Sequence, residues 1–250
     1  MPSDQTLPER RFYAGPERLD GDEVRLDPEE TRHLARVLRL GPGARVGVFD
    51  GLGMELEAEV LTVAGEEARL RVVRRLPPLG ESPLDLVLAI ALAKAEAQDL
   101  AVRQATEMGV KRIIPFICRR SENLDPNRMA ARLNRWRRAA RETLKSCRRS
   151  FLPEILAPAG FSGILAGPEE LKVIFWEEER PGGGYSFKAS APPAGVRLLI
   201  GPEGGFTLKE VEQARAAGFK VASLGPRRLK VETAALAALT LVQHAFGDLG

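Results

Sequence analysis

The chain has 250 residues, of which 44% are hydrophobic and 28% are charged, and its formal net charge at pH 7 is +3. This length can form one large or two modest domains with a substantial apolar core. No run comes near the roughly 20 apolar residues of a membrane span, and the N-terminus lacks a signal-peptide pattern. Two cysteines and two histidines are too few for a metal cluster or a disulfide framework. We therefore expect a cytoplasmic protein that has no metal site and no membrane association.

The first part of the chain has the pattern of a small β-rich domain. Short alternating runs at 45–49 and 68–73 predict half-buried strands, with turn-forming residues between them. A short helix is predicted over 28–40, with Gly41 as the glycine that ends it. Because several short strands must satisfy their edges, we expect them to form a barrel.

A basic segment rich in proline and glycine, residues 74–80, marks a domain boundary. Beyond it, strand and helix patterns alternate, which predicts an α/β domain with a mainly parallel sheet. We therefore expect a β-barrel domain over 1–76 and an α/β domain over 77–250. Strands are expected at 84–92, 112–118, 172–176, 196–200 and 220–224, and helices at 96–108, 126–149, 208–217 and 232–246.

Two glycine-containing turns near the C-terminus are the most informative motifs. Residues 201–206 read Gly-Pro-Glu-Gly-Gly-Phe, and residues 224–234 read Leu-Gly-Pro-Arg-Arg-Leu-Lys-Val-Glu-Thr-Ala. Each follows an apolar, strand-like run and leads towards a helix, which is where ligands bind in parallel α/β sheets. Neither turn has the spacing of a dinucleotide site or the lysine of a P-loop. We interpret them as holding a nucleotide-like ligand through backbone groups.

The long helix predicted over 126–149 combines an apolar stripe with many cations. Apolar residues recur at three- and four-residue steps, and most of the arginines, including Arg135 and Arg138, lie away from that stripe. We interpret the cations as a contact for a polyanion, and a solvated surface helix is the alternative. Contact with a nucleic-acid backbone would make binding strongly salt-dependent.

The two glycine turns closely resemble the signature of the RsmE-type 16S ribosomal RNA (uracil-N3) methyltransferases of the SPOUT superfamily. The similarity extends to residues 11–13, 33–41 and 104–110, and so covers nearly the whole chain. Lys230-Val231 and Met108 depart from the usual family residues. The resemblance implies an enzyme that uses S-adenosylmethionine to methylate N3 of a specific uridine in 16S rRNA of the small ribosomal subunit. It also implies a homodimer.

The resemblance further implies a fold and a cofactor site. The expected fold is a SPOUT-type α/β domain with a mainly parallel sheet and a trefoil knot, preceded by a PUA-like β-barrel that binds RNA. S-adenosylmethionine would be held by three loops, which follow the strands near residues 175, 200 and 224. The residues expected to bind it are Trp176, Ile200, Gly201, Pro202, Glu203, Gly204, Gly205, Leu224, Gly225, Leu229, Thr233 and Ala234.

Catalytic roles are expected for Arg11, Arg228 and Glu232. Uridine N3 must lose its proton before or during attack, and a nearby arginine would stabilise the resulting anion. Each residue also has a simpler explanation: exposed arginines often pair with acids, and Glu232 lies at a helix N-terminus, where the helix dipole favours an acid. RNA contacts are expected from Arg11, His33, Arg39, Arg120, Arg135 and Arg138.

Two other functions remain open from the residues. One is a non-catalytic RNA-binding or ribosome-assembly factor that retains the fold, and the intact glycine turns disfavour it. The other is an enzyme that uses a different nucleotide in an unknotted, Rossmann-like domain. The missing phosphate-loop spacing disfavours this second alternative.

Overall fold

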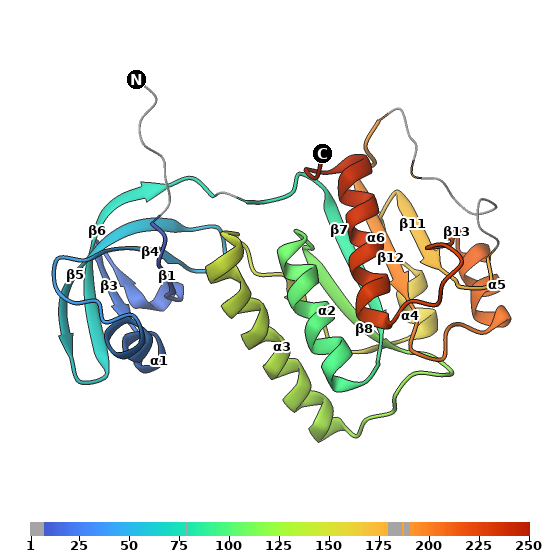
Figure 1. The fold of residues 1–250 in the computed structure, drawn as a ribbon, viewed down its shortest axis with the longest axis horizontal. Coiled ribbons are helices and arrows are strands. Elements are labelled where there is room, and N and C mark those ends of the chain that lie inside the picture. The colour runs from blue at the N-terminus through green and yellow to red at the C-terminus, as the bar shows by residue number, and fades with distance from the viewer. Residues whose placement is uncertain (1–7, 79, 180–186, 188–190) are drawn as a thin grey trace. The chain divides into compact units, whose positions relative to one another are not determined.

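The structure, a computed structural model, describes residues 8–78, 80–179, 187 and 191–250 (Figure 1). The chain divides into two compact units. The N-terminal unit comprises Met1–Glu81 together with Arg141–Leu152, and the C-terminal unit comprises Ser82–Ala140 and Pro153–Gly250. No helix among the described residues is long and apolar enough to cross a membrane.

The N-terminal unit is built on a curled six-stranded sheet with the strand order β1-β4-β5-β6-β3-β2. The first two of these strands pair in parallel and the other neighbours pair antiparallel. Alternate residues of β3 and β6 point into a core that includes Val24, Leu26 and Leu70, as the period of a half-buried strand requires. The strands are β1 (Arg11–Tyr13), β2 (Leu19–Asp20), β3 (Glu23–Leu26), β4 (Arg45–Phe49), β5 (Glu55–Ala64) and β6 (Glu67–Leu76), and a 3-10 turn, η1 (Pro16–Arg18), precedes β2.

The helical segment of this unit is shorter than predicted and changes its winding. Helix α1 (Pro28–Arg32) continues directly into a π-helical turn, η2 (His33–Val37). The turn closes when the Leu38 amide donates to the His33 carbonyl at 3.0 Å. Arg39 then adopts a left-handed φ of 55°. The predicted helix end at Gly41 is therefore wrong, because the wider turn reaches its left-handed residue two positions earlier.

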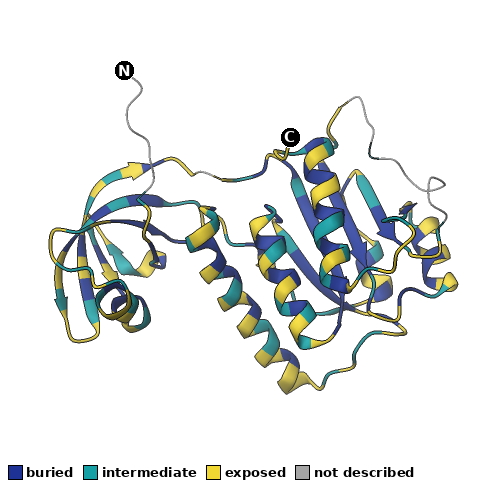
Figure 2. Ribbon diagram, in the orientation of Figure 1, coloured by how far each residue is buried: buried dark blue, intermediate teal, exposed yellow. Residues whose placement is uncertain are grey.

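The C-terminal unit is a sheet in which every pairing among the described residues is parallel. The order is β10-β8-β7-β12-β11-β13, with β9 also paired to β8. The central strands are buried on both faces (Figure 2), which explains their unbroken apolar runs. The bounds are β7 (Asp85–Ala91), β8 (Arg112–Ile117), β9 (Glu154–Ile155), β10 (Ala159–Gly160), β11 (Leu171–Phe175), β12 (Gly195–Ile200) and β13 (Lys220–Ala222).

Among the residues that the structure describes, five helices alternate with these strands along the chain, and four of them were predicted. Gly109, with a φ of 78°, follows the end of α2, as a helix-ending glycine should. The long helix α3 ends at Cys147, and Arg148 has a left-handed φ of 63°, so the helix does not continue to Arg149. The helices are α2 (Ala95–Glu107), α3 (Pro126–Cys147), α4 (Phe161–Leu165), α5 (Leu208–Ala216) and α6 (Val231–Phe246).

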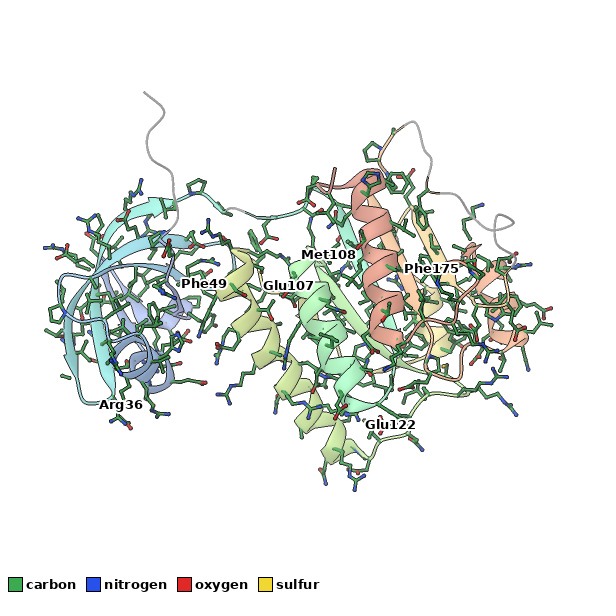
Figure 3. All side chains as sticks on the ribbon, in the orientation of Figure 1. Arg36, Phe49, Glu107, Met108, Glu122 and Phe175 are labelled. Carbon is green, nitrogen blue, oxygen red and sulfur yellow. The ribbon has the colours of Figure 1, made fainter. Side chains whose placement is uncertain are left out.

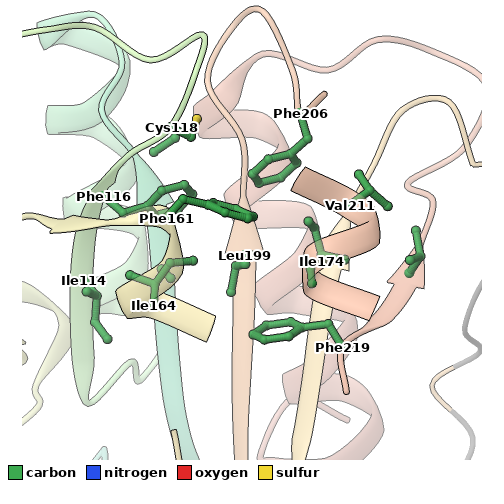
Figure 4. Packing of buried hydrophobic residues seen from close by; sticks show 14 of the residues in the cluster. Ile114, Phe116, Cys118, Phe161, Ile164, Ile174, Leu199, Phe206, Val211 and Phe219 are labelled. Carbon is green, nitrogen blue, oxygen red and sulfur yellow. The ribbon is translucent and has the colours of Figure 1, made fainter. Parts of the chain in front are cut away.

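One face of the parallel sheet carries an aromatic core (Figure 4). Phe116 of β8 and Phe206, which follows β12, are buried with nearly parallel rings whose centroids lie 6.2 Å apart. Phe161 of α4 packs against both rings at 6.0 Å. The glycine turn over 201–206 is therefore anchored to the sheet at its last residue.

Candidate functional site

A pocket of about 370 Å³ lies at the carboxyl ends of β11, β12 and β13. These strands are neighbours in the sheet and run parallel, so the loops that follow them open at one edge. The two glycine turns form much of the wall. The lining residues are Arg120, Phe175, Trp176, Glu177, Glu178, Ile200, Gly201, Pro202, Glu203, Gly204, Gly205, Phe206, Leu224, Gly225, Arg227, Arg228, Leu229, Val231 and Ala234.

The pocket gathers the residues that were expected to bind the cofactor, with one exception. Thr233 is the third residue of α6, is exposed, and does not line the pocket. Lys230 holds the N-cap position of this helix. The expected residues in the lining are Trp176, Ile200, Gly201, Pro202, Glu203, Gly204, Gly205, Leu224, Gly225, Leu229 and Ala234.

Two glycines of the pocket adopt a left-handed backbone conformation. Gly205 has a φ of 68°, and a Cβ placed there would lie 2.0 Å from Glu177 Oε1. Gly225 has a φ of 101°, but a Cβ there would face open space. Both φ values favour glycine. At 205 a larger residue would also have to move the Glu177 carboxylate, whereas at 225 the space beside the turn is free.

Polar contacts hold the first glycine turn in place. Glu203 Oε1 accepts a hydrogen bond from the Lys94 amide at 3.0 Å, which ties the turn to the start of α2. Arg120 Nη1 donates to the Gly204 carbonyl at 2.7 Å, which ties it to the loop after β8. Glu203 thus lines the pocket and also anchors its own loop.

The walls of the pocket carry both apolar and charged side chains. Phe175, at the end of β11, and Trp176 supply apolar surface (Figure 3), and Glu177 and Glu178 supply carboxylates. The indole Nε1 of Trp176 is buried and has no hydrogen-bond partner among the described residues. Such a donor is costly unless a ligand brings an acceptor. The pocket therefore suits a ligand with an aromatic group, a cationic group and at least one acceptor.

The three residues expected to be catalytic lie in different places. Arg228 lines the pocket, in the segment between β13 and α6. Glu232 is half-buried in the first turn of α6 and does not line it, although its neighbour Val231 does. Arg11 belongs to the N-terminal unit.

Arg11 is a structural residue of that unit. Its guanidinium is buried and binds both carboxylate oxygens of Glu55, with Nε–Oε1 at 3.1 Å and Nη2–Oε2 at 2.6 Å. It also donates to the carbonyls of Leu144 at 2.5 Å and Arg149 at 2.9 Å, and it lies over the Phe49 ring. We therefore correct the expectation that Arg11 contacts RNA or uracil, because its donors are used inside the unit.

The cations of α3 are largely paired with acids, and a polyanion contact on this helix stays a prediction. Arg135 pairs with Asp99 at 2.9 Å and Arg132 pairs with Glu122 at 2.9 Å. Lys145 binds Glu30 at 2.5 Å. Arg138 is exposed. The sequence shows the cations on one helix, but some of the acids that pair with them come from other helices, as Asp99 of α2 and Glu30 of α1 do.

Two further residues expected to contact RNA differ in character. His33 is half-buried beside the Phe12 ring, and burial followed by the nearby Lys145 ammonium holds the pKa of His33 below its usual value. Its neutral ring is therefore favoured. Arg39, which follows η2, is exposed, as is Arg36 within η2 (Figure 3), and neither has an ion-pair partner within the described part of the chain.

Known proteins resemble both units. A family of RNA methyltransferase domains matches residues 80–243, and a family of RNA methyltransferase PUA domains matches residues 26–73. Ribosomal RNA small subunit methyltransferase E from Synechocystis is 34% identical, over 93% of this chain and 76% of its own length. The same enzyme from Bacillus subtilis is 29% identical, over 86% of this chain and 88% of its own length.

Solved structures of methyltransferases also resemble this chain over nearly its whole length. Ribosomal RNA small subunit methyltransferase E from Neisseria gonorrhoeae, bound to S-adenosylmethionine, is 30% identical and superposes with a TM-score of 0.87. That match covers 98% of this chain and all of the other. A methyltransferase from Legionella pneumophila, also with bound S-adenosylmethionine, is 32% identical with a TM-score of 0.85, over 96% and 98% of the two chains. This chain therefore belongs to the ribosomal RNA small subunit methyltransferase E family.

Proposed function

We propose that this protein transfers the methyl group of S-adenosylmethionine to N3 of one uridine in small-subunit rRNA. Membership of its family makes it an S-adenosylmethionine-dependent rRNA methyltransferase. The observation that carries the proposal is the pocket at the strand ends, because both glycine turns and the aromatic end of β11 converge there. Uridine as the base, N3 as the methylated atom and the small ribosomal subunit as the substrate are what we propose beyond this family activity.

The residues present fit S-adenosylmethionine. Phe175, Trp176 and Leu229 offer apolar surface for a purine, and backbone groups of the glycine turns can reach its edge. The carboxylates of Glu177 and Glu178 complement a ligand with cationic sulfonium and amino groups. When bound, the cofactor supplies a methyl group on a positively charged sulfur. The chain then has to align the acceptor nitrogen and exclude competing water.

Arg228 is the residue that we assign to the acceptor base. Uridine N3 carries a proton at neutral pH, and its loss leaves negative charge shared with the carbonyl oxygens O2 and O4. Arg228 lines the pocket and has no ion-pair partner within the described residues, so its charge is available to stabilise that anion. Glu232, one residue from the pocket wall, remains the second proposed catalytic group.

The RNA contacts are proposed for exposed arginines of both units. Arg39 in the N-terminal unit and Arg120 at the pocket carry the expected role, while Arg135 and Arg138 of α3 are weaker candidates because of the ion pairing on that helix. We also propose His33 as a neutral contact. Phosphate contacts of this kind would position the RNA without selecting the base.

The assembly is proposed to be a knotted homodimer that acts in the cytoplasm. The apolar stripe of α3 is used inside the chain, since Trp136 and Leu144 are fully buried. Helix α6, in contrast, leaves Leu241 41% exposed. We therefore place the two-fold interface on α6. The trefoil knot is proposed around the pocket, where the segment between β13 and α6 meets the loops after β11 and β12.

A methylation assay tests the proposed function. Purified small subunits and naked 16S rRNA from a strain lacking this activity are incubated with the protein and isotopically labelled S-adenosylmethionine. Mass spectrometry of the digested nucleosides should then find label in 3-methyluridine, with the assembled subunit as the better substrate. Label in another nucleoside would refute the assignment of uridine N3, and absence of label from rRNA would refute the function.

A further inference from the structure

Glu210 makes more contacts than its place in a helix requires. It is the third residue of α5 and is only 7% exposed. With the N-cap residue Thr207 it forms a capping box, in which the Glu210 amide donates to Thr207 Oγ1 at 3.3 Å and the Thr207 amide donates to Glu210 Oε2 at 2.8 Å. Stabilisation of the helix start would by itself explain a glutamate at this position.

The second carboxylate oxygen of Glu210 binds a different loop. Glu210 Oε1 accepts a hydrogen bond from the amide of Arg119 at 2.9 Å, and Arg119 lies in the loop after β8. That loop is itself a tight turn, because Ser121 Oγ donates to the Cys118 carbonyl at 2.9 Å and accepts from the Cys118 amide at 3.0 Å. The capping box uses one oxygen only, so the contact with Arg119 is additional.

The same loop meets the glycine turn a second time. Arg120 Nη1 donates to the Gly204 carbonyl at 2.7 Å, and a Cβ placed on Gly204 would lie 3.1 Å from Arg120 Cβ. Arg120 and Gly204 both line the pocket. The loop after β8 and the segment after β12 are thus joined by Glu210 at one end and by Arg120 at the other.

The charge of Glu210 suits this role. Burial raises the pKa of Glu210, but hydrogen bonds from the amides of Arg119 and Thr207 outweigh it and leave the pKa below its usual value. The side chain is therefore a carboxylate at neutral pH and accepts at both oxygens. On the apolar side, Phe206 stacks on Phe116, so the glycine turn is held by packing and by polar contacts together (Figure 4).

We propose that Glu210 is a positioning residue for methyl transfer, which holds the Arg119 backbone so that Arg120 stays on the glycine turn and presents its guanidinium to the incoming RNA. Arg120 is exposed and has no ion-pair partner among the described residues, as an RNA contact requires. The inference rests on the proposed function, in which this pocket binds S-adenosylmethionine. The competing explanation is that Glu210 only caps α5.

The test compares two variants that damage the same helix cap. Glu210→Ala removes the carboxylate half of the capping box and the contact with Arg119. Thr207→Ala removes the hydroxyl half, including the bond from Thr207 Oγ1 to Glu210 Oε2 at 2.7 Å, and leaves the Arg119 amide on Glu210 Oε1. Steady-state methylation of small subunits should show kcat/KM for the RNA reduced about tenfold in Glu210→Ala, the value expected for a lost hydrogen bond to a charged group. It should change less than about twofold in Thr207→Ala, although thermal unfolding should show both variants to be destabilised.

A double-mutant cycle identifies the residue through which Glu210 acts. Arg120→Ala should lower kcat/KM for the RNA at least as much as Glu210→Ala, and the double variant should be no worse than Arg120→Ala alone. If the two losses multiply, or if Thr207→Ala loses as much activity as Glu210→Ala, the inference is wrong.

Hydrogen exchange tests the loop contact without any activity. Peptides that cover residues 118–122 should exchange faster in Glu210→Ala and at the wild-type rate in Thr207→Ala; equal rates in all three proteins would overturn the inference. If Glu210→Ala does not fold, Glu210→Gln takes its place, because its single oxygen cannot serve both loops. A wild-type protein that fails to bind S-adenosylmethionine in calorimetry would refute the proposed pocket, whatever the exchange shows.

Discussion

Arg11 and Glu55 form a bidentate ion pair in the interior of the N-terminal unit, and their side chains are 1% and 0% exposed. The guanidinium also binds carbonyls of residues 144 and 149, which follow in the chain more than 130 residues later. The pair therefore connects β1 to β5 and to residues 141–152, the second segment of this unit.

We predict that Arg11→Ala destabilises the protein by about 3–5 kcal/mol, because it leaves the Glu55 carboxylate buried without its partner. Urea unfolding measures the loss. Arg45→Ala is the matched control, since its ion pair with Glu57 is on the surface and should contribute less than about 1 kcal/mol. A stable Arg11→Ala protein with greatly reduced turnover would instead restore the catalytic role.

The pocket should lose its ligand when Gly201 is enlarged. A Cβ at Gly201 would lie 3.1 Å from the Phe206 ring, which is fixed by its stack on Phe116, so a valine must displace the glycine turn. We expect wild-type binding of S-adenosylmethionine near −8 kcal/mol, or about micromolar, and a loss of about a hundredfold or more in Gly201→Val. Calorimetry measures both. Gly41→Val, at a glycine that faces open space in the other unit, should bind normally.

Arg228→Ala should separate chemistry from cofactor binding. If its guanidinium stabilises the uracil anion, single-turnover methylation at saturating subunit and cofactor should slow about 10²-fold, by analogy with lost oxyanion donors. Binding of S-adenosylmethionine should change little. Arg215→Ala, which removes an exposed arginine paired with Glu179, is the control. Wild-type rates in Arg228→Ala would remove it from the mechanism.

The salt dependence of RNA binding should distinguish paired from unpaired arginines. Arg39→Ala should reduce the slope of log K against log salt by about one unit, because an exposed arginine without an ion-pair partner in the described structure can replace counterions on a phosphate. Arg135→Ala should reduce it less, since Asp99 already neutralises that arginine. Filter binding across a salt series gives both slopes, and a larger effect at Arg135 would favour the basic helix as the main RNA contact.

Local patterns in the sequence determined much of the fold and the outline of the pocket. The apolar runs at 84–92 and 196–200 predicted strands because buried parallel strands need apolar residues on both faces. Gly109 marked a helix end because glycine alone adopts a positive φ without strain. The two glycine turns predicted the pocket because loops after parallel strands open at one edge of the sheet.

Only the tertiary structure decided which charges are available. Arg11 and the arginines of α3 look like free cations in the sequence. However, Glu55 and Asp99 reach Arg11 and Arg135 from distant segments, and Glu122 reaches Arg132 from the loop before α3. Residues 141–152 belong to the N-terminal unit, where Arg11 binds the carbonyls of Leu144 and Arg149. The contact between Glu210 and Arg119 joins two loops. Pairing of this kind depends on which surfaces pack together, and no periodicity in the chain encodes that directly.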